Sequence, residues 1–289
     1  MTSSSYSASH LTPTWVGLVD DAAIFPPGDA PLHEASAAHV ARRSRWWADL
    51  VGTFVVRDTD VPLLRGSPAR LSVVVTGGAG QVAGPAALCR RLGLGLAGLE
   101  IALRDLDDLA GNARRVVAAV DAARAGDDLA EDVPVHVELP SVEPGPDWLR
   151  AADTVAEAGL RLKFRTGGAD ADHFPSAARL ATWIDASLDR ETPFKCTAGL
   201  HRALRHRDPQ TGFEHHGFLN VLIATQQAFD GLSLHGVGAV LDEQSDAATI
   251  ALAMDTDLAG GRRWFTSFGS CSVEEPLETL VATGLLEDR

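Results

Sequence analysis

The sequence has few of the features that mark secreted, membrane-spanning or zinc-ribbon proteins. Its three cysteines, Cys89, Cys196 and Cys271, are widely spaced and form no CxxC pair, which argues against a disulfide framework or a zinc ribbon. No apolar run approaches the roughly 20 residues that span a bilayer. The Ser-rich start, Met1 to His10, lacks the basic and apolar regions of a targeting signal. We therefore expect a cytoplasmic protein without a membrane partner.

Positive charge is also in deficit, because the formal net charge at pH 7 is −14. Nucleic acids and anionic membranes are bound through basic patches, so neither is an expected partner. A small anionic substrate would need a local cationic pocket. With 45% hydrophobic and 22% charged residues, the chain has the composition of a folded globular protein. Assembly into a homo-oligomer stays open.

Lysine is the scarcest charged residue: of the 25 lysines and arginines, only Lys163 and Lys195 are lysines. Arginine could supply positive charge equally well, but its guanidinium does not deprotonate. It therefore cannot serve as a Schiff-base nucleophile or a general base. The two lysines indicate a site that requires an amine.

Short β-rich segments alternate with amphipathic helical ones, which is typical of an α/β fold with parallel strands. Counting the segments predicts a (β/α)8, TIM-type barrel, with a doubly wound sheet as the alternative. The eight expected strands are Val16–Val19, Phe54–Val56, Leu71–Thr76, Leu99–Leu103, Val133–Leu139, Leu160–Thr166, Pro193–Thr197 and Trp264–Phe268.

Helical patterns fill most of the intervals between these strands, with apolar residues recurring at spacings of three and four. The expected helices are Pro31–Leu50, Asp105–Ala123, Asp147–Ala158, Phe174–Leu188 and one that begins near Val273. Gly217–Asp257 is mostly helical where a seventh strand is expected, so the barrel is predicted to be distorted or partly open there. We expect one domain over residues 15–289, preceded by a flexible N-terminus at 1–14.

Side chains alternate between the two faces of a strand, so residues two apart point the same way. In four consecutive predicted strands the apolar set suits the helix layer, which leaves a polar set for the barrel interior. This polar set is Glu100, His136, Glu138, Lys163, Arg165, Lys195 and Thr197. Charged groups are seldom buried unless they are paired or functional, so the set is either an active site or a structural ion-pair network beneath a binding site.

Loops after the strands add further candidates. His201 follows a lysine-bearing strand by four residues, in the region where barrel enzymes carry their chemistry. Two glycine-rich strand ends could present backbone amides to a phosphate or carboxylate beside Arg165. Their candidate residues are Gly167, Gly168, Gly269 and Ser270. His215 and His216 could be metal ligands, or could belong to a polar turn or helix cap.

The segment Lys195-Cys-Thr-Ala-Gly resembles the strand end of deoxyribose-phosphate-aldolase-type class I aldolases, where a lysine precedes small residues, a threonine and a glycine. In that family the Schiff-base lysine lies in a barrel strand, with a second lysine and an acid nearby. The resemblance covers five residues. It implies that Lys195 forms the Schiff base and that Lys163 lowers its pKa by like-charge repulsion. Here the second lysine lies on the preceding strand rather than the following one.

The leading hypothesis is a lyase, aldolase-like, acting on a small anionic carbonyl compound through a lysine iminium and without a cofactor. Lys195 would attack the carbonyl, Glu138 or His136 would move protons, and Arg165 would bind the anion. Glu100, Thr197 and His201, with the glycine-rich strand ends, would complete the substrate site. One alternative is a divalent-metal-dependent lyase, isomerase or hydrolase that uses Glu100, His136, Glu138 and a nearby histidine as ligands. Another is a non-catalytic protein that binds a sugar phosphate or organic acid.

Overall fold

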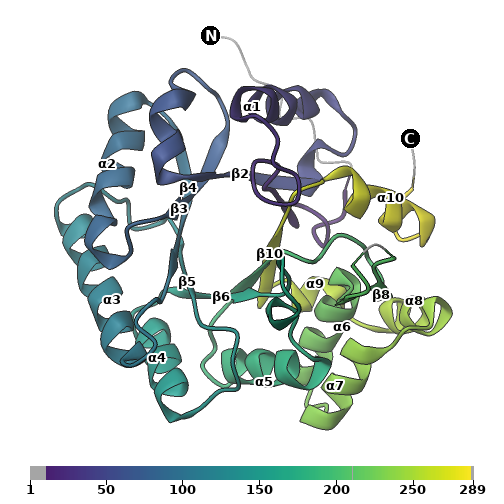
Figure 1. The fold of residues 1–289 in the computed structure, drawn as a ribbon. Helices are drawn as coiled ribbons and strands as arrows, with labels where there is room; N and C mark the ends of the chain where they lie inside the picture. Colours follow the sequence, from purple (N-terminus) through teal and green to yellow (C-terminus); the bar gives the residue numbers. More distant parts are fainter. Residues whose placement is uncertain (1–10, 210, 288–289) are drawn as a thin grey trace.

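The computed structural model describes residues 11–209 and 211–287. Eight parallel strands form a closed barrel in the order β1-β10-β7-β6-β5-β4-β3-β2. Helices surround this barrel as an outer ring (Figure 1). The prediction of a TIM-type α/β barrel is therefore confirmed, and the doubly wound alternative is wrong.

Each predicted strand overlaps a strand of the barrel. The first lies further along the chain than expected, because it begins at Val19 and includes Asp20 and Asp21. The barrel strands are β1 Val19–Asp21, β2 Val51–Arg57, β3 Arg70–Val75, β4 Gly95–Ala102, β5 Val135–Glu138, β6 Arg161–Arg165, β7 Phe194–Thr197 and β10 Phe265–Ser270.

The expected gap at the seventh strand is absent, because β7 pairs directly with β10 and closes the barrel. A register shift between Phe265 and Ser267 is the irregularity in this pairing. The chain between the two strands forms a small antiparallel hairpin, β8 (His206–Arg207) with β9 (Glu214–His215), and then a group of helices. The helical pattern of this segment was correct, but no barrel strand was missing.

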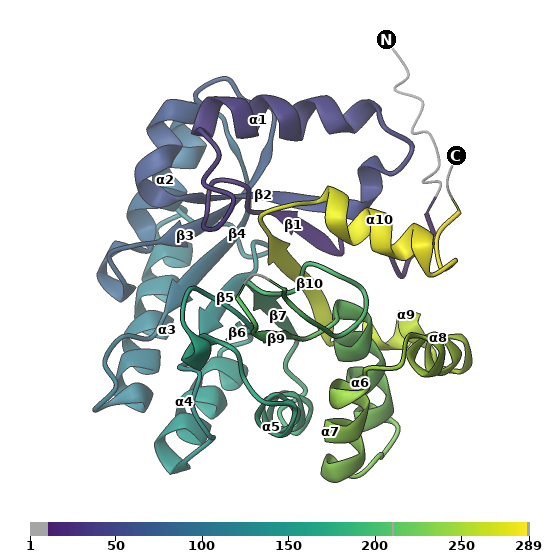
Figure 2. The ribbon, with the colours of Figure 1, turned by 45° about the vertical axis from the view of Figure 1, so that its right-hand side comes forward.

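Helices alternate with the strands (Figures 1 and 2). The predicted helix over Pro31–Leu50 is too long: α1 ends at Ala41, and two short 3-10 turns lead to Leu50. The helices are α1 Leu32–Ala41, α2 Ala83–Leu92, α3 Leu109–Ala125, α4 Pro146–Glu157, α5 Ala177–Leu188, α6 Phe218–Phe229, α7 Leu234–Asp242, α8 Asp246–Asp255, α9 Leu258–Gly261 and α10 Glu274–Ala282. The expected flexible N-terminus at 1–14 falls largely on residues 1–10, outside the described part of the chain.

The main core lies between the outer face of the strands and the helices. Phe164 of β6 contacts Trp148 of α4 and Trp183 of α5, with ring centroids 6.3 and 5.6 Å apart. Phe194 of β7 packs on the same ring at 5.2 Å. Burial of each such side chain contributes roughly 1.5–3 kcal/mol. The apolar residues of these strands thus face outward, and the polar residues between them are directed into the barrel. Among the described residues no helix is long and apolar enough to cross a membrane.

Candidate active site

The strand register brings the two lysines together. Lys163 of β6 lies opposite Lys195 of β7 in the parallel pairing, and Glu138 of β5 lies opposite Lys163. Both ammonium groups are buried, with 5% and 2% of their side chains exposed. Both lysine side chains therefore point into the barrel, as strand alternation predicted.

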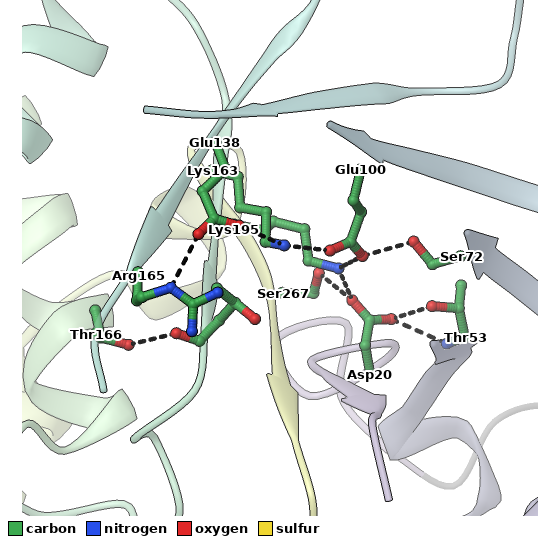
Figure 3. A network of polar contacts seen from close by, with 11 residues as sticks. Asp20, Thr53, Ser72, Glu100, Glu138, Lys163, Arg165, Thr166, Lys195 and Ser267 are labelled. Carbon is green, nitrogen blue, oxygen red and sulfur yellow. Dashed lines mark hydrogen bonds and ion pairs between the residues drawn. The ribbon is translucent and has the colours of Figure 1, made fainter. Parts of the chain in front are cut away.

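Glu100 of β4 joins the two lysines, because each amine contacts a different oxygen of its carboxylate (Figure 3). Lys163 Nζ lies 2.7 Å from Oε2, and Lys195 Nζ lies 2.8 Å from Oε1. The Ser72 hydroxyl also donates to Oε1, at 2.7 Å. Because Glu100 accepts from both amines, any change to this carboxylate alters the surroundings of both lysines at once.

Asp20 is the site residue that the sequence did not identify. Its Oδ2 accepts a hydrogen bond from Lys195 Nζ at 2.6 Å and another from the Ser267 hydroxyl at 2.7 Å. Its Oδ1 accepts from the backbone N–H and the hydroxyl of Thr53, at 3.0 and 2.7 Å. Gly52 is required beside it, since a Cβ there would lie 2.8 Å from Oδ1.

On the other side, Glu138 connects Lys163 to Arg165. Lys163 Nζ lies 2.9 Å from Glu138 Oε2, and Arg165 Nε donates to Oε1 at 3.0 Å. The side chains become more exposed in this direction: 5% for Lys163, 14% for Glu138 and 36% for Arg165. Since Glu138 and Arg165 are the last residues of β5 and β6, this side of the network opens toward the C-terminal end of the barrel.

Six charged groups thus form a continuous chain in which cations and anions alternate (Figure 3). The three carboxylates balance the three cations, so the chain is neutral overall. Its members, in order of contact, are Asp20, Lys195, Glu100, Lys163, Glu138 and Arg165. Removing any inner member leaves a buried charge without one of its partners.

The pairing fixes the ionisation of both lysines. Burial by itself would lower the pKa of Lys195, but the Asp20 and Glu100 carboxylates outweigh burial and raise it above its ordinary value. Glu100 and Glu138 likewise raise the pKa of Lys163 despite its burial. The expectation that Lys163 lowers the pKa of Lys195 is therefore wrong for this state of the protein, because Glu100 lies between the two amines and contacts both.

The carboxylates shift in the complementary direction. Burial opposes ionisation of Glu100, yet Lys163 and Lys195 together hold its pKa well below its ordinary value. Lys195 also keeps the pKa of Asp20 low against the effect of burial, and Lys163 does the same for Glu138. The network is thus fully charged near neutral pH.

His136 is not part of this chain. Its side chain is buried, and neither ring nitrogen has a hydrogen-bond partner among the residues that the structure describes. Burial, followed by the nearby charge of Lys195, lowers its pKa to about 3, so the ring is neutral at physiological pH. His136 pairs with Arg161 at the start of β6, whereas Glu138 pairs with Lys163 further along the strand. The two proton carriers predicted on β5 therefore lie at different levels of the barrel.

The predicted glycine-rich strand ends lie at the C-terminal end of the barrel. Gly167 is in backbone contact with Gly199: a Cβ on Gly167 would lie 2.6 Å from the Gly199 Cα. Thr166 donates its backbone N–H to Thr197 and its hydroxyl to Ala198, at 2.9 and 2.6 Å. This packing explains why glycine is needed at 167. A role of Gly167 and the exposed Gly168 in binding an anion stays a prediction.

His201 and the end of β10 meet at the same end of the barrel. The His201 Nδ1 lies 3.1 Å from a Glu275 carboxylate oxygen and 3.5 Å from the Ser270 hydroxyl. Gly269 pairs with both Thr197 and Asp20, so it borders the charged network directly. Ser270, Gly269 and His201 are thus brought together at this end of the barrel, and their role in binding substrate stays a prediction.

The metal-dependent alternative receives no support from the side chains. Within residues 11–209 and 211–287, no group of three His, Cys, Asp or Glu side chains is placed to hold a metal ion. Glu100 and Glu138 direct their oxygens at lysines. His216 is buried and contacts the Pro175 carbonyl at 2.8 Å, and His215 contacts the Gly199 carbonyl at 3.1 Å.

Comparison with known proteins agrees with the fold. No family model and no curated protein matches the sequence. Among solved structures, the deoxyribose phosphate aldolase from Aeropyrum pernix aligns with a TM-score of 0.56 and 13% identity, over 95% of this chain and 94% of that one. A putative deoxyribose-phosphate aldolase from Toxoplasma gondii ME49 aligns in two structures with TM-scores of 0.54, at 14% identity over 95% and 96% of the two chains, and at 16% over 96% and 95%. The chain is therefore similar in fold, over nearly its whole length, to deoxyribose-phosphate aldolases.

Proposed function

We propose that the protein is an aldolase-like lyase that forms an iminium between a buried lysine and a small anionic carbonyl compound. The observation that carries the proposal is the placement of the only two lysines on one carboxylate inside the barrel. An amine is the group that a Schiff base requires, and arginine could have filled a purely ionic role. The fold supports the same reading, because it is shared with aldolases that act on a sugar phosphate. A small phosphorylated aldehyde or ketone is the substrate class we propose.

The sequence resemblance points to Lys195 as the nucleophile, but the geometry favours Lys163. Barrel enzymes bind substrates at the C-terminal end of the strands. Lys163 contacts Glu138, whose other oxygen accepts from Arg165 at that end. Lys195 is held by Asp20 and lines a cavity at the opposite end. We therefore assign the attack to Lys163, and to Lys195 the role of a fixed cation that stabilises the Glu100 carboxylate.

Substrate binding provides a route to the neutral amine. In the free protein Lys163 is protonated, and a protonated amine does not attack a carbonyl. An anionic group that binds Arg165 competes with Glu138 for the guanidinium. Glu138 then loses one of its two cations, its pKa rises, and it becomes a better acceptor for the Lys163 proton. The neutral amine adds to the carbonyl carbon, Glu138 returns the proton to the departing hydroxyl, and loss of water completes the iminium.

Borohydride trapping tests the proposal. The protein is incubated with phosphorylated and carboxylated aldehydes or ketones, reduced, digested and mapped by mass spectrometry. We expect one adduct on the peptide that contains Lys163, absent in Lys163→Met. The chain has only one other lysine, so peptide mapping also separates an adduct on the N-terminal amine from one in the barrel.

Arg165→Gln is the matched control. It should reduce trapping of anionic carbonyls relative to that of a neutral aldehyde, because only the anionic carbonyl uses Arg165 as a binding partner. An adduct on Lys195 alone would reverse the assignment of the two lysines. Absence of an adduct on either lysine with any carbonyl would contradict the function, and would favour a structural ion-pair network.

A further inference from the structure

A cavity lies at the N-terminal end of the barrel, opposite the proposed substrate mouth. Its volume is about 170 Å³. Arg70 and Arg161 are the first residues of β3 and β6, Gly52 is the second residue of β2, and Gly17 precedes β1; all four line it. Because the strands are parallel, these positions share one end of the barrel. That end usually serves stability in this fold, so a polar cavity there calls for an explanation.

His136 is directed into this cavity with its hydrogen bonds unmade. The side chain lines the cavity, only 6% of it is exposed, and both ring nitrogens lack a partner in the described part of the chain. A buried polar group without a partner costs about 1–3 kcal/mol. A ligand that offers hydrogen bonds to the neutral ring would recover this cost.

Two arginines supply positive charge to the same cavity. Within residues 11–209 and 211–287, neither Arg70 nor Arg161 forms an ion pair with a carboxylate. Burial also lowers the pKa of the Arg161 guanidinium below its ordinary value. A negatively charged ligand would provide the missing compensation.

We propose that this N-terminal cavity is a binding site for a small oxyanion, a phosphate or a short carboxylate. The guanidinium groups of Arg70 and Arg161 compensate its charge, and the N–H of the neutral His136 ring donates to one of its oxygens. An engineered cavity of about 150 Å³ holds benzene, so a ligand of about ten non-hydrogen atoms or fewer fits. Binding at this site does not depend on the aldolase proposal.

The position of the cavity links it to the charged network. Lys195 and Asp20 form part of its wall. An oxyanion there competes with Asp20 and Glu100 for the Lys195 ammonium, and Glu100 is also the partner of Lys163. Occupancy of the cavity therefore alters both lysines from the side opposite the substrate mouth, and by linkage a ligand at either end changes the affinity at the other.

Isothermal titration calorimetry with inorganic phosphate and with malonate, at constant ionic strength in chloride, tests the site. We expect saturable binding of at least one of the two anions, and the stronger of them identifies the oxyanion class. Arg161→Gln and Arg70→Gln should each weaken binding at least tenfold. Histidine ring ¹⁵N NMR should show the His136 nitrogens shifting on titration, which reports the contact without a substitution in the interior.

Two control variants separate this cavity from other anion sites. Arg114→Gln removes an exposed arginine from the outer face of α3, and Arg165→Gln removes the arginine at the C-terminal mouth. Arg114→Gln should bind the anion as the unmodified protein does, and Arg165→Gln should retain the binding that depends on Arg161. The proposal is overturned if neither anion saturates, if Arg161→Gln binds normally, or if Arg165→Gln alone abolishes binding.

Discussion

Replacing Glu100 by glutamine should destabilise the protein by about 3–5 kcal/mol, the range for removing one partner of a buried ion pair. The substitution keeps the size and the acceptor for Ser72, but it removes the negative charge between two ammonium groups. Each lysine retains one carboxylate, Asp20 for Lys195 and Glu138 for Lys163, at 2.6 and 2.9 Å. We therefore expect a loss near the lower end of that range.

Urea unfolding at pH 7 measures this loss, with an unchanged m-value as the sign that the unfolding reaction is the same. The control is Glu143→Gln, which breaks an ion pair with Arg179 at a position where 64% of the glutamate side chain is exposed. A surface pair of this kind contributes at most about 1 kcal/mol. If Glu100→Gln cost no more than Glu143→Gln, the reasoning that Glu100 is the buried partner of both lysines would be refuted.

Two further predictions concern the interior of the barrel. Because the pKa of His136 is lowered to about 3, the unfolded chain binds a proton that the folded chain does not between about pH 6.5 and 3. Stability should therefore fall as pH drops through this window, by up to about 1.4 kcal/mol per pH unit from this residue. His136→Leu should remove that part of the slope in urea unfolding at pH 4–7, and an unchanged slope would contradict the assignment. Gly52→Ala should cost about 1–3 kcal/mol, because the new Cβ would lie 2.8 Å from Asp20 Oδ1. Gly84→Ala in α2 meets no neighbouring atom within 4 Å and should be neutral or stabilising, and equal effects of the two substitutions would argue against a close contact at Asp20.

Strand alternation explains why much of the site could be predicted from the sequence. In β6 and β7 the apolar residues Leu162, Phe164 and Phe194 pack against the helices. Lys163 lies between Leu162 and Phe164, and Lys195 lies between Phe194 and the buried Cys196, so the pleat directs both lysines into the interior. The closed parallel barrel then places them opposite each other in register.

The parts that failed depend on information that alternation does not contain. β1 has only three residues, too few to show alternation, so Asp20 was not among the predicted site residues. Alternation also predicts which face of a strand a side chain lies on, but it does not predict which end of the barrel interior that side chain reaches. His136 and Glu138 share a face, yet two residues of a strand span roughly 7 Å, and they serve opposite ends of the interior. The pKa of the lysines could not be inferred either, because only the closed barrel places Glu100 between them.

The central claim, that both lysines share one buried carboxylate, can be tested most directly by ¹⁵N NMR of the lysine side chains. Because the chain contains only two lysines, selective labelling yields two Nζ signals. Both should remain in the ammonium form through pH 10.5, the ordinary lysine pKa, and Glu100→Gln should shift both signals together. An amine that deprotonates at or below pH 10.5 in the unmodified protein, or a Glu100→Gln variant in which only one signal moves, would contradict the claim.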